Sequence, residues 1–229
     1  MIIKLVRHGQ SLANTGEVNS TEVGDCNVAL SAAGLAQARR AGELIGPEYV
    51  AKSLIYYSPY LRARQTMYGI FDGSNVLAHP LVSGDLSNLR IYEDIRLREI
   101  EFGFHKIQDE VTAERKLRQL HGWMFHRYSG GESPANCFDR MCLFIESMYR
   151  QIERKNASRI LIVTHGMPLR CFVARFLHLT VEQFADMRDP HNGDVVTIAD
   201  KASISDSAFE HGKWAVTGLK LRSRGPATT

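Results

Sequence analysis

The chain has 229 residues, of which 44% are hydrophobic and 23% are charged, a composition typical of globular proteins and unlike that of disordered chains, collagens or coiled coils. Its 28 basic and 25 acidic residues give a formal net charge of +3, far below the concentrated positive charge of a protein that coats nucleic acid. The sequence has no run of 18 apolar residues and no apolar N-terminal run long enough for a signal peptide, so we expect neither a nucleic-acid nor a membrane partner.

Cysteine usage indicates the cellular compartment. The four cysteines show neither a C-x-x-C spacing nor the density of a disulfide scaffold, and they stand at Cys26, Cys137, Cys142 and Cys171. Such cysteines are typical of reduced thiols. We therefore expect a cytoplasmic protein.

Three segments repeat the pattern of a buried strand, a turn and an amphipathic helix. The predicted strands are residues 2–6, 54–57 and 159–164. The predicted helices begin at the N-cap Ser31, at Ser58-Pro59, where serine caps and proline takes the first helical position, and at Pro168. The second of these continues to Ile70 and the third to His178. Three such units predict a parallel sheet.

A long insertion, at about residues 75–133, separates the second unit from the third. It contains a strand-like segment, Tyr92 to Leu97, and a basic helical segment, Asp109 to Tyr128. Ser133-Pro134 then opens a long helix with an apolar stripe at helical spacing, which we assign to core packing. The stripe consists of Phe138, Met141, Cys142, Ile145, Tyr149 and Ile152.

The chain after residue 180 contains a further short helix and two predicted strands, Val195 to Ala199 and Trp214 to Leu221, and ends in a tail, 223–229, that we expect to be unstructured. No linker or repeat divides the chain. We therefore predict one domain over residues 1–229, an α/β three-layer sandwich in which helices flank a mostly parallel central sheet. The insertion at about 75–133 would form a cap over the carboxyl ends of the strands, where open α/β sheets bind ligands.

The predicted topology brings four polar side chains to that edge of the sheet. His8 and His165 end two strands, Arg7 precedes His8, and Arg62 lies early in the second helix. Two guanidinium groups can donate paired hydrogen bonds to phosphoryl oxygens, one imidazole can donate another, and the second imidazole can attack phosphorus. These residues therefore predict a pocket for phosphoryl transfer.

Six stretches in this order resemble the histidine phosphatase superfamily, which includes phosphoglycerate mutases and many phosphatases. They are LVRHGQS at 5–11 followed by Asn14, LSxxGxxQA at 30–38, YSPxxRAxQT at 57–66, REIEFG at 98–103, GES at 131–133 and VTHG at 163–166. A series of motifs in order is far more specific than any one of them.

The resemblance implies a role for each matching residue. His8 matches the nucleophile that forms a phosphohistidine, and Arg7, Arg62 and His165 match the residues that bind the phosphoryl group. Glu99 matches the proton donor. Lesser phosphate ligands are matched by Asn14, Gly166 and the main-chain amide of Met167.

Two alternatives remain open from the residues themselves. Glu101 could present its carboxylate in place of Glu99, since both follow Arg98 closely, and Arg64 could take the place of Arg62. His105, His121 and His126 could suggest a metal site, but the last two are five residues apart, whereas two ligands on one helix face usually stand three or four apart. We expect no metal and no cofactor.

The sequence also departs from the family pattern. Gln10 stands where many members carry glutamate, Ala13 stands where mutases and several phosphatases carry tryptophan, and Phe104-His105-Lys106 replaces a Trp-Glu-Gly element of many phosphatases. Ala13 and the altered rim favour the phosphatase branch over a mutase.

Basic residues of the insertion are candidates for substrate specificity. In the family that this sequence resembles, the corresponding insertion usually overhangs the active site, which implies that Arg115, Arg118 and Arg127 could select substrates that carry a second anionic group. The same segment mixes bases with aromatic residues and so also allows RNA stacking, but a solvated helix over the pocket is the simpler interpretation.

The function that we predict is metal-independent hydrolysis of a phosphomonoester through a phosphohistidine, with a small phosphorylated molecule as substrate. The alternatives are a cofactor-dependent phosphoglycerate mutase and a non-catalytic module that binds a phospho-ligand or a protein on the same fold. The sequence identifies neither the ester nor the oligomeric state.

Overall fold

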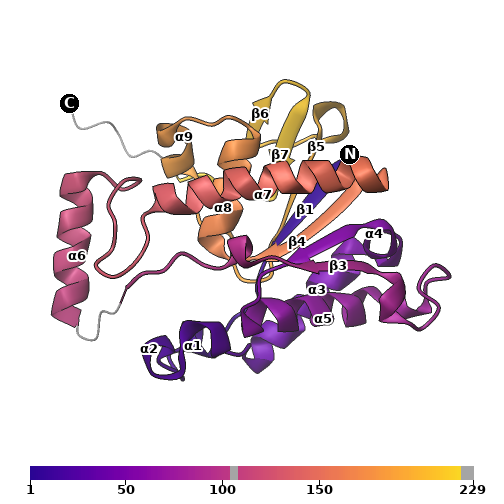
Figure 1. Ribbon diagram of the computed structural model, residues 1–229, viewed down its shortest axis with the longest axis horizontal. Helices are drawn as coiled ribbons and strands as arrows, with labels where there is room; N and C mark the ends of the chain where they lie inside the picture. The colour runs from indigo at the N-terminus through magenta and orange to yellow at the C-terminus, as the bar shows by residue number, and fades with distance from the viewer. Residues whose placement is uncertain (104–107, 223–229) are drawn as a thin grey trace.

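The computed structural model describes residues 1–103 and 108–222 (Figure 1), except for the side chains of residues 108–112 and of Arg115. Phe104-His105-Lys106 and the predicted tail at 223–229 lie outside the described residues.

The described residues form a mixed seven-stranded sheet in the order β3-β2-β4-β1-β5-β7-β6. Its strands are β1 (Ile2–Arg7), β2 (Leu54–Tyr57), β3 (Arg90–Glu93), β4 (Arg159–Thr164), β5 (Val195–Asp200), β6 (Phe209–His211) and β7 (Trp214–Thr217). The first four strands pair in parallel, whereas β5, β6 and β7 pair antiparallel. The predicted α/β fold with a mostly parallel sheet is confirmed.

Helices cover both faces of the sheet (Figure 1), which makes the fold a three-layer sandwich. The helices of the described residues are α1 (Leu12–Thr15), α2 (Ser20–Val23), α3 (Ala32–Ile45), α4 (Pro47–Lys52), α5 (Leu61–Ser74), α6 (Gln108–His121), α7 (Pro134–Lys155), α8 (Gly166–Phe176) and α9 (Val181–Asp186). Helices α7 and α8 pack on one face, and α3, α4 and α5 pack on the other. None of these helices is long and apolar enough to cross a bilayer.

The parallel strands supply two separate cores because alternate side chains of a strand point to opposite faces. In β4, Ile160 and Ile162 face the α7–α8 core, whereas Leu161 and Val163 face the core of α3, α4 and α5. All four side chains are fully buried. This burial on both faces explains why these strands are continuous apolar runs in the sequence.

Two of the predicted helix N-caps are confirmed, and a third is wrong. Ser31 and Ser133 cap α3 and α7, as expected, because each side chain accepts a hydrogen bond from the backbone N–H three residues later, that of Gly34 or Asn136. Ser58 was expected to cap α5, but this prediction is wrong, because the helix begins after Tyr60, which makes no side-chain cap bond. The Ser58 hydroxyl instead lies 2.8 Å from a ring nitrogen of His165.

Several element boundaries also differ from the predictions. The strand expected at Tyr92 to Leu97 is β3, which ends at Glu93 and joins the edge of the sheet, so part of the predicted cap belongs to the sheet layer. Helix α8 begins at Gly166 and not at Pro168, β7 ends at Thr217, and the short strand β6 has no counterpart among the predictions.

The buried stripe of α7 is offset from the predicted one. Met141 and Ile145 are buried as expected, but the other buried apolar side chains are those of Pro134, Cys137, Phe144 and Met148. Tyr149, which we placed in the stripe, is exposed. Both stripes have helical spacing, so the periodicity identified the helix but not the centre of its buried face.

Candidate active site

The register of the sheet brings the two histidines together. Arg7 pairs with Thr164 where β1 and β4 end, so His8 and His165 follow at the same edge. Their ring centroids lie 5.0 Å apart, and the rings are steeply inclined to one another. The predicted meeting of the first and third units at one edge is therefore present in the structure.

His8 is held as a neutral imidazole with one nitrogen available for attack. Its Nδ1 lies 2.7 Å from the carbonyl oxygen of Gly9 and donates to it, which leaves Nε2 without a proton. Nε2 accepts a hydrogen bond from Nε of Arg62 at 3.3 Å. Burial, together with the positive charge of Arg62, lowers the pKa of His8 to about 3. Nε2 therefore carries a lone pair at neutral pH.

His165 lies at the N-cap of α8 and is fully buried. The Ser58 hydroxyl, 2.8 Å from its Nε2, can donate to that nitrogen, and Nδ1 then carries the proton. Nδ1 has no hydrogen-bond partner among the described residues. Burial and the charge of Arg62 hold the pKa of His165 well below its usual value. His165 is thus neutral, and its Nδ1–H can donate a hydrogen bond to an oxygen of a ligand.

Arg7 and the start of α8 contribute further positive potential. A terminal nitrogen of Arg7 donates to the carbonyl oxygen of Pro190, and its Nε is buried without a partner among the described residues. Gly166 and Met167 begin α8 and line the cavity. The first amides of a helix have no acceptor within the helix and favour an anion at that end.

Asn14 also lines the cavity, at the end of the capping box of α1. Its side-chain oxygen accepts a hydrogen bond from the backbone of Ser11 at 3.0 Å and another from the amide of Asn192 at 3.3 Å. With its oxygen engaged in this way, the amide nitrogen is the part of Asn14 left to bind an oxygen of a ligand.

Arg62 enters the cavity from the first turn of α5 and is buried, whereas Arg64 is exposed. The terminal nitrogens of Arg62 bind Asp25, a residue that no sequence motif singled out. NH1 donates to Oδ1 of Asp25 at 2.9 Å and NH2 donates to Oδ2 at 3.1 Å. Asp25 begins a short 3₁₀ helix, Asp25–Asn27, within a polar stretch of sequence.

Both candidate proton donors line the cavity, but their environments differ. An oxygen of Glu99 accepts a hydrogen bond from the backbone N–H of Ile100 at 2.8 Å. Burial raises the pKa of Glu99, and that hydrogen bond and the charges of Arg62 and Arg7 oppose the rise only in part. The side chain of Glu101 is exposed. Glu99 is therefore the carboxyl group whose surroundings favour the protonated form.

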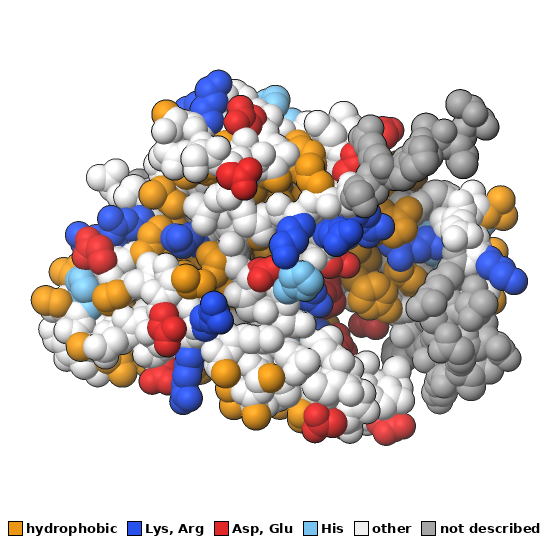
Figure 2. Space-filling view, turned by 180° about the vertical axis from the view of Figure 1, so that it is seen from behind, with side chains coloured by type: hydrophobic (Ala, Val, Ile, Leu, Met, Phe, Trp, Pro, Cys, Tyr) orange, Lys and Arg blue, Asp and Glu red, His pale blue; other side chains and the backbone are white. Residues whose placement is uncertain are grey.

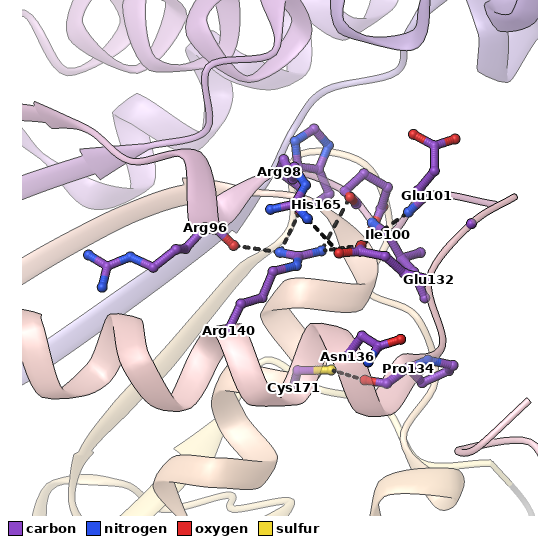
Figure 3. Close-up of polar contacts among 12 residues, drawn as sticks. Arg96, Arg98, Ile100, Glu101, Glu132, Pro134, Asn136, Arg140, His165 and Cys171 are labelled. Carbon is purple, nitrogen blue, oxygen red and sulfur yellow. Dashed lines mark hydrogen bonds and ion pairs between the residues drawn. The ribbon is translucent and has the colours of Figure 1, made fainter. Parts of the chain in front are cut away.

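Arg140 of α7 and Glu132 fix the loop that carries Glu99 (Figure 3). Arg140 is buried and donates to the carbonyl oxygens of Arg96, Arg98 and Glu99, the last two at 2.8 and 3.2 Å. Its second terminal nitrogen also binds Oε2 of Glu132 at 3.2 Å. The other carboxylate oxygen of Glu132 accepts a hydrogen bond from Arg98. The GES motif thus holds the loop of Glu99, the candidate proton donor, from the side away from the cavity.

The cavity has a volume of about 380 Å³. In Figure 2 the molecule is hollowed beside a group of basic, acidic and histidine side chains. Besides the groups already described, the cavity is lined by Asp189, whose carboxylate accepts a hydrogen bond from Arg170 at 2.9 Å. Among the described lining residues, the only arginines or lysines are Arg7 and Arg62.

The structure gives the basic candidates of the insertion other contacts. The guanidinium of Arg118 lies 4.4 Å from the ring centroid of Trp123, and Nε of Arg127 donates to the carbonyl oxygen of Gly131 at 2.9 Å. Neither Arg118 nor Arg127 lines the cavity, so the lining of the cavity gives no support to the specificity role predicted for them. The side chain of Arg115 lies outside the described residues.

Two of the three histidines that could suggest a metal site bind each other. Nδ1 of His121 lies 3.2 Å from Nδ1 of His126, whose Nε2 binds Glu114 at 3.1 Å. His105 lies outside the described residues. Within the described part of the chain, no group of three or more histidine, cysteine or acidic side chains is arranged to hold a metal ion.

The sequence is similar to one protein family and to individual proteins from plants and yeast. A model of the histidine phosphatase superfamily (branch 1) matches residues 3–220. The chain is 32% identical, over 209 residues, to the phosphoglycerate mutase-like protein AT74 of Arabidopsis thaliana; the match covers 84% of this chain and only 63% of the length of that protein. It is 24% identical, over 290 residues, to the broad-range acid phosphatase DET1 of Saccharomyces cerevisiae, with coverage of 89% and 86%.

Solved structures share the fold at lower identity. The mycobacterial glucosyl-3-phosphoglycerate phosphatase, solved as a complex with VO3, superposes with a TM-score of 0.66 at 18% identity over 96% of each chain. A putative alpha-ribazole-5'-P phosphatase of Escherichia coli gives a TM-score of 0.65 at 22% identity over 97% of this chain and 94% of the other.

Proposed function

This chain belongs to the histidine phosphatase superfamily (branch 1), and from that premise we propose that it is a metal-independent phosphomonoesterase that works through a phosphohistidine at His8. The observation that carries the proposal is the state of His8: Nδ1 donates to Gly9, and the unprotonated Nε2 faces the guanidinium of Arg62. A nucleophilic nitrogen beside a phosphate-binding group is what the first step requires.

In the first step Nε2 of His8 attacks phosphorus, and the bond from phosphorus to the ester oxygen breaks. Arg7 and Arg62 stabilise the negative charge of the phosphoryl oxygens, and Nδ1–H of His165 supplies a further donor. The carbonyl oxygen of Gly9 stabilises the positive charge that the imidazole gains, because Nδ1–H continues to donate to it. These fixed donors supply the positive field that a metal ion provides in other phosphatases.

Glu99 completes both halves of the reaction. Its raised pKa keeps the carboxyl group protonated over a wider pH range, so that it can donate a proton to the leaving oxygen. The resulting carboxylate then accepts a proton from the water that attacks the phosphohistidine, which regenerates the acid and releases inorganic phosphate. His8 returns to its neutral form in the same step.

The composition of the cavity favours hydrolysis over the mutase reaction. A bisphosphate brings a second phosphoryl charge to be neutralised, whereas the only arginines or lysines among the described lining residues, Arg7 and Arg62, lie together with Asp25, Glu101 and Asp189. The small phosphorylated substrate that we propose therefore carries one phosphoryl group. The four cysteines are free thiols, which suits the cytoplasm.

The test is a phosphate-release panel of sugar phosphates, nucleotides, inositol phosphates, phosphopeptides and 3-phosphoglycerate, the last with and without its bisphosphate cofactor. We expect the wild type and the control His211→Ala, at an exposed position, to release phosphate in EDTA, and His8→Ala to release none. An acid-labile, base-stable phosphoryl label should form on the wild type and on His211→Ala, but not on His8→Ala. Isomerisation of 3-phosphoglycerate without release would support the mutase, and phosphate-ester binding without turnover would support the binding module.

A further inference from the structure

Asp25 holds the guanidinium of Arg62 at its outer end. NH1 and NH2 of Arg62 each donate to one carboxylate oxygen of Asp25, and NH1 donates again to the Asp25 carbonyl oxygen at 2.6 Å. The remaining bonded donor, Nε–H, points to Nε2 of His8. A guanidinium has five N–H groups in one plane, so four are engaged and a single one, on NH2, is left.

The position of that last N–H follows from the planar geometry of the group. One N–H of NH2 lies parallel to an N–H of NH1, and this outer pair binds the carboxylate of Asp25. The other N–H of NH2 lies parallel to Nε–H on the neighbouring edge, and Nε–H is directed at His8. The edge that remains for a phosphoryl group is thus the one beside the reacting nitrogen.

We propose that Asp25 is a positioning residue, which turns the Nε edge of Arg62 toward the phosphoryl group on His8. The proposal rests on the proposed function of the cavity. A paired hydrogen bond fixes both the direction and the plane of the guanidinium, which a single contact cannot do. Arg62 can then bind two phosphoryl oxygens without releasing Asp25, and only its contact with the lone pair of His8 is exchanged.

The local structure of the 12–27 segment is consistent with this role. Gly24, which precedes Asp25, has a φ of +79°, a conformation that L side chains rarely adopt, and this turn starts the 3₁₀ helix of Asp25. The helices α1 and α2 and the 3₁₀ helix contain no buried residues.

Two rival interpretations of the Asp25–Arg62 pair exist. Because Arg62 belongs to the well-packed helix α5, the first is that Asp25 merely anchors the 12–27 segment to that helix. A second rival is that Asp25 competes with phosphate for Arg62.

The variant Asp25→Asn separates these interpretations. An amide keeps the size of the side chain but presents one donor where the carboxylate had an acceptor, so the paired bond cannot form. We expect the affinity for orthovanadate, measured by titration calorimetry, and kcat for p-nitrophenyl phosphate each to fall about tenfold or more, the size of one hydrogen bond to a charged group. KM should change less, and the melting temperature should change by no more than about 2 °C.

Two further variants serve as references. Asp72→Asn removes a carboxylate that binds an arginine, Arg39, at the exposed side of the same helix α5 and away from the cavity, and it should change vanadate affinity by less than about threefold. Asp25→Glu keeps the carboxylate and should recover part of the loss. If Asp25→Glu binds vanadate no better than Asp25→Asn, or if Asp72→Asn loses as much affinity as Asp25→Asn, the proposal is overturned.

The decisive measurement repeats Asp25→Asn in the background of Arg62→Ala. A positioning role predicts no further loss of vanadate affinity there, because the group being positioned is gone. An equal loss in both backgrounds would show that Asp25 anchors the segment, and tighter binding of inorganic phosphate to Asp25→Asn would show competition; either result overturns the proposal. Binding is measured without turnover, so a wild type that binds vanadate but hydrolyses no ester refutes only the proposed function, and one that binds neither anion refutes both.

Discussion

Replacement of Glu99 by glutamine tests which carboxyl group protonates the leaving oxygen. The amide oxygen of glutamine can still accept the hydrogen bond from Ile100 N–H, 2.8 Å away in the native structure, so the loop held by Arg140 should keep its conformation. The variant thus removes the transferable proton and little else. Glu101→Gln is the matched control, because its side chain lines the same cavity but is exposed.

The expected size of the effect depends on the leaving group. An alkoxide leaves poorly at neutral pH, and general-acid assistance typically contributes about 10²–10⁴ in rate. We therefore expect Glu99→Gln to lower kcat/KM for alkyl phosphates at least about 100-fold, which corresponds to ~2.7 kcal/mol of transition-state free energy. Hydrolysis of p-nitrophenyl phosphate, whose leaving group hardly needs a proton, should change little. Glu101→Gln should leave both substrates near the wild-type rate.

The pH dependence gives an independent readout of the same assignment. Because burial raises the pKa of Glu99, kcat/KM for alkyl phosphates should fall as the pH rises through that value, and this limb should be absent in Glu99→Gln. On the acid side His8 stays neutral down to its pKa of about 3, so activity should persist well below pH 6. The reasoning is refuted if Glu101→Gln shows the dependence on leaving group and Glu99→Gln shows none.

Three further predictions concern stability and packing. The pKa of His8 is lowered from 6.5 to about 3, so the unfolded state binds more protons than the folded state between these pH values, and the free energy of unfolding decreases as the pH falls below 6.5. In chemical denaturation, the decrease in this free energy between pH 6.5 and 4.5 should be about 2–3 kcal/mol smaller in His8→Ala than in the wild type. An equal decrease in both proteins would contradict this prediction. A Cβ at Gly34 would collide with the carbonyl group of Gln10, so Gly34→Ala should lower the melting temperature by about 5 °C or more. Gly46 has open space around a Cβ and only a positive φ, so Gly46→Ala should lower the melting temperature by less. Arg118→Glu removes the contact with the Trp123 ring and should destabilise the protein by about 1 kcal/mol, with equal effects on singly and multiply charged esters; a selective loss on the latter would restore the predicted specificity role.

Much of the fold was determined by the sequence through local chemistry. The strand from Arg159 to Thr164 was predicted with its observed bounds because its two buried faces require a continuous apolar run. The helix that starts after Ser31 was predicted because capping and helical periodicity involve residues within one or two turns of each other. The six motifs in order indicated the family, and His8 and His165 were expected at one edge of the sheet because each follows a predicted strand; the register of β1 and β4 brings them there.

Other features were decided only by the tertiary structure, because they depend on residues far apart in the chain. Ser58 has the local signature of an N-cap, yet its hydroxyl binds His165, 107 residues later, because β2 and β4 end side by side. Asp25 stands in a polar stretch without a motif and meets Arg62 37 residues later. Nothing in the neighbourhood of either residue encodes these contacts. They exist because the sheet register and the packing of α5 determine which side chains the cavity brings together.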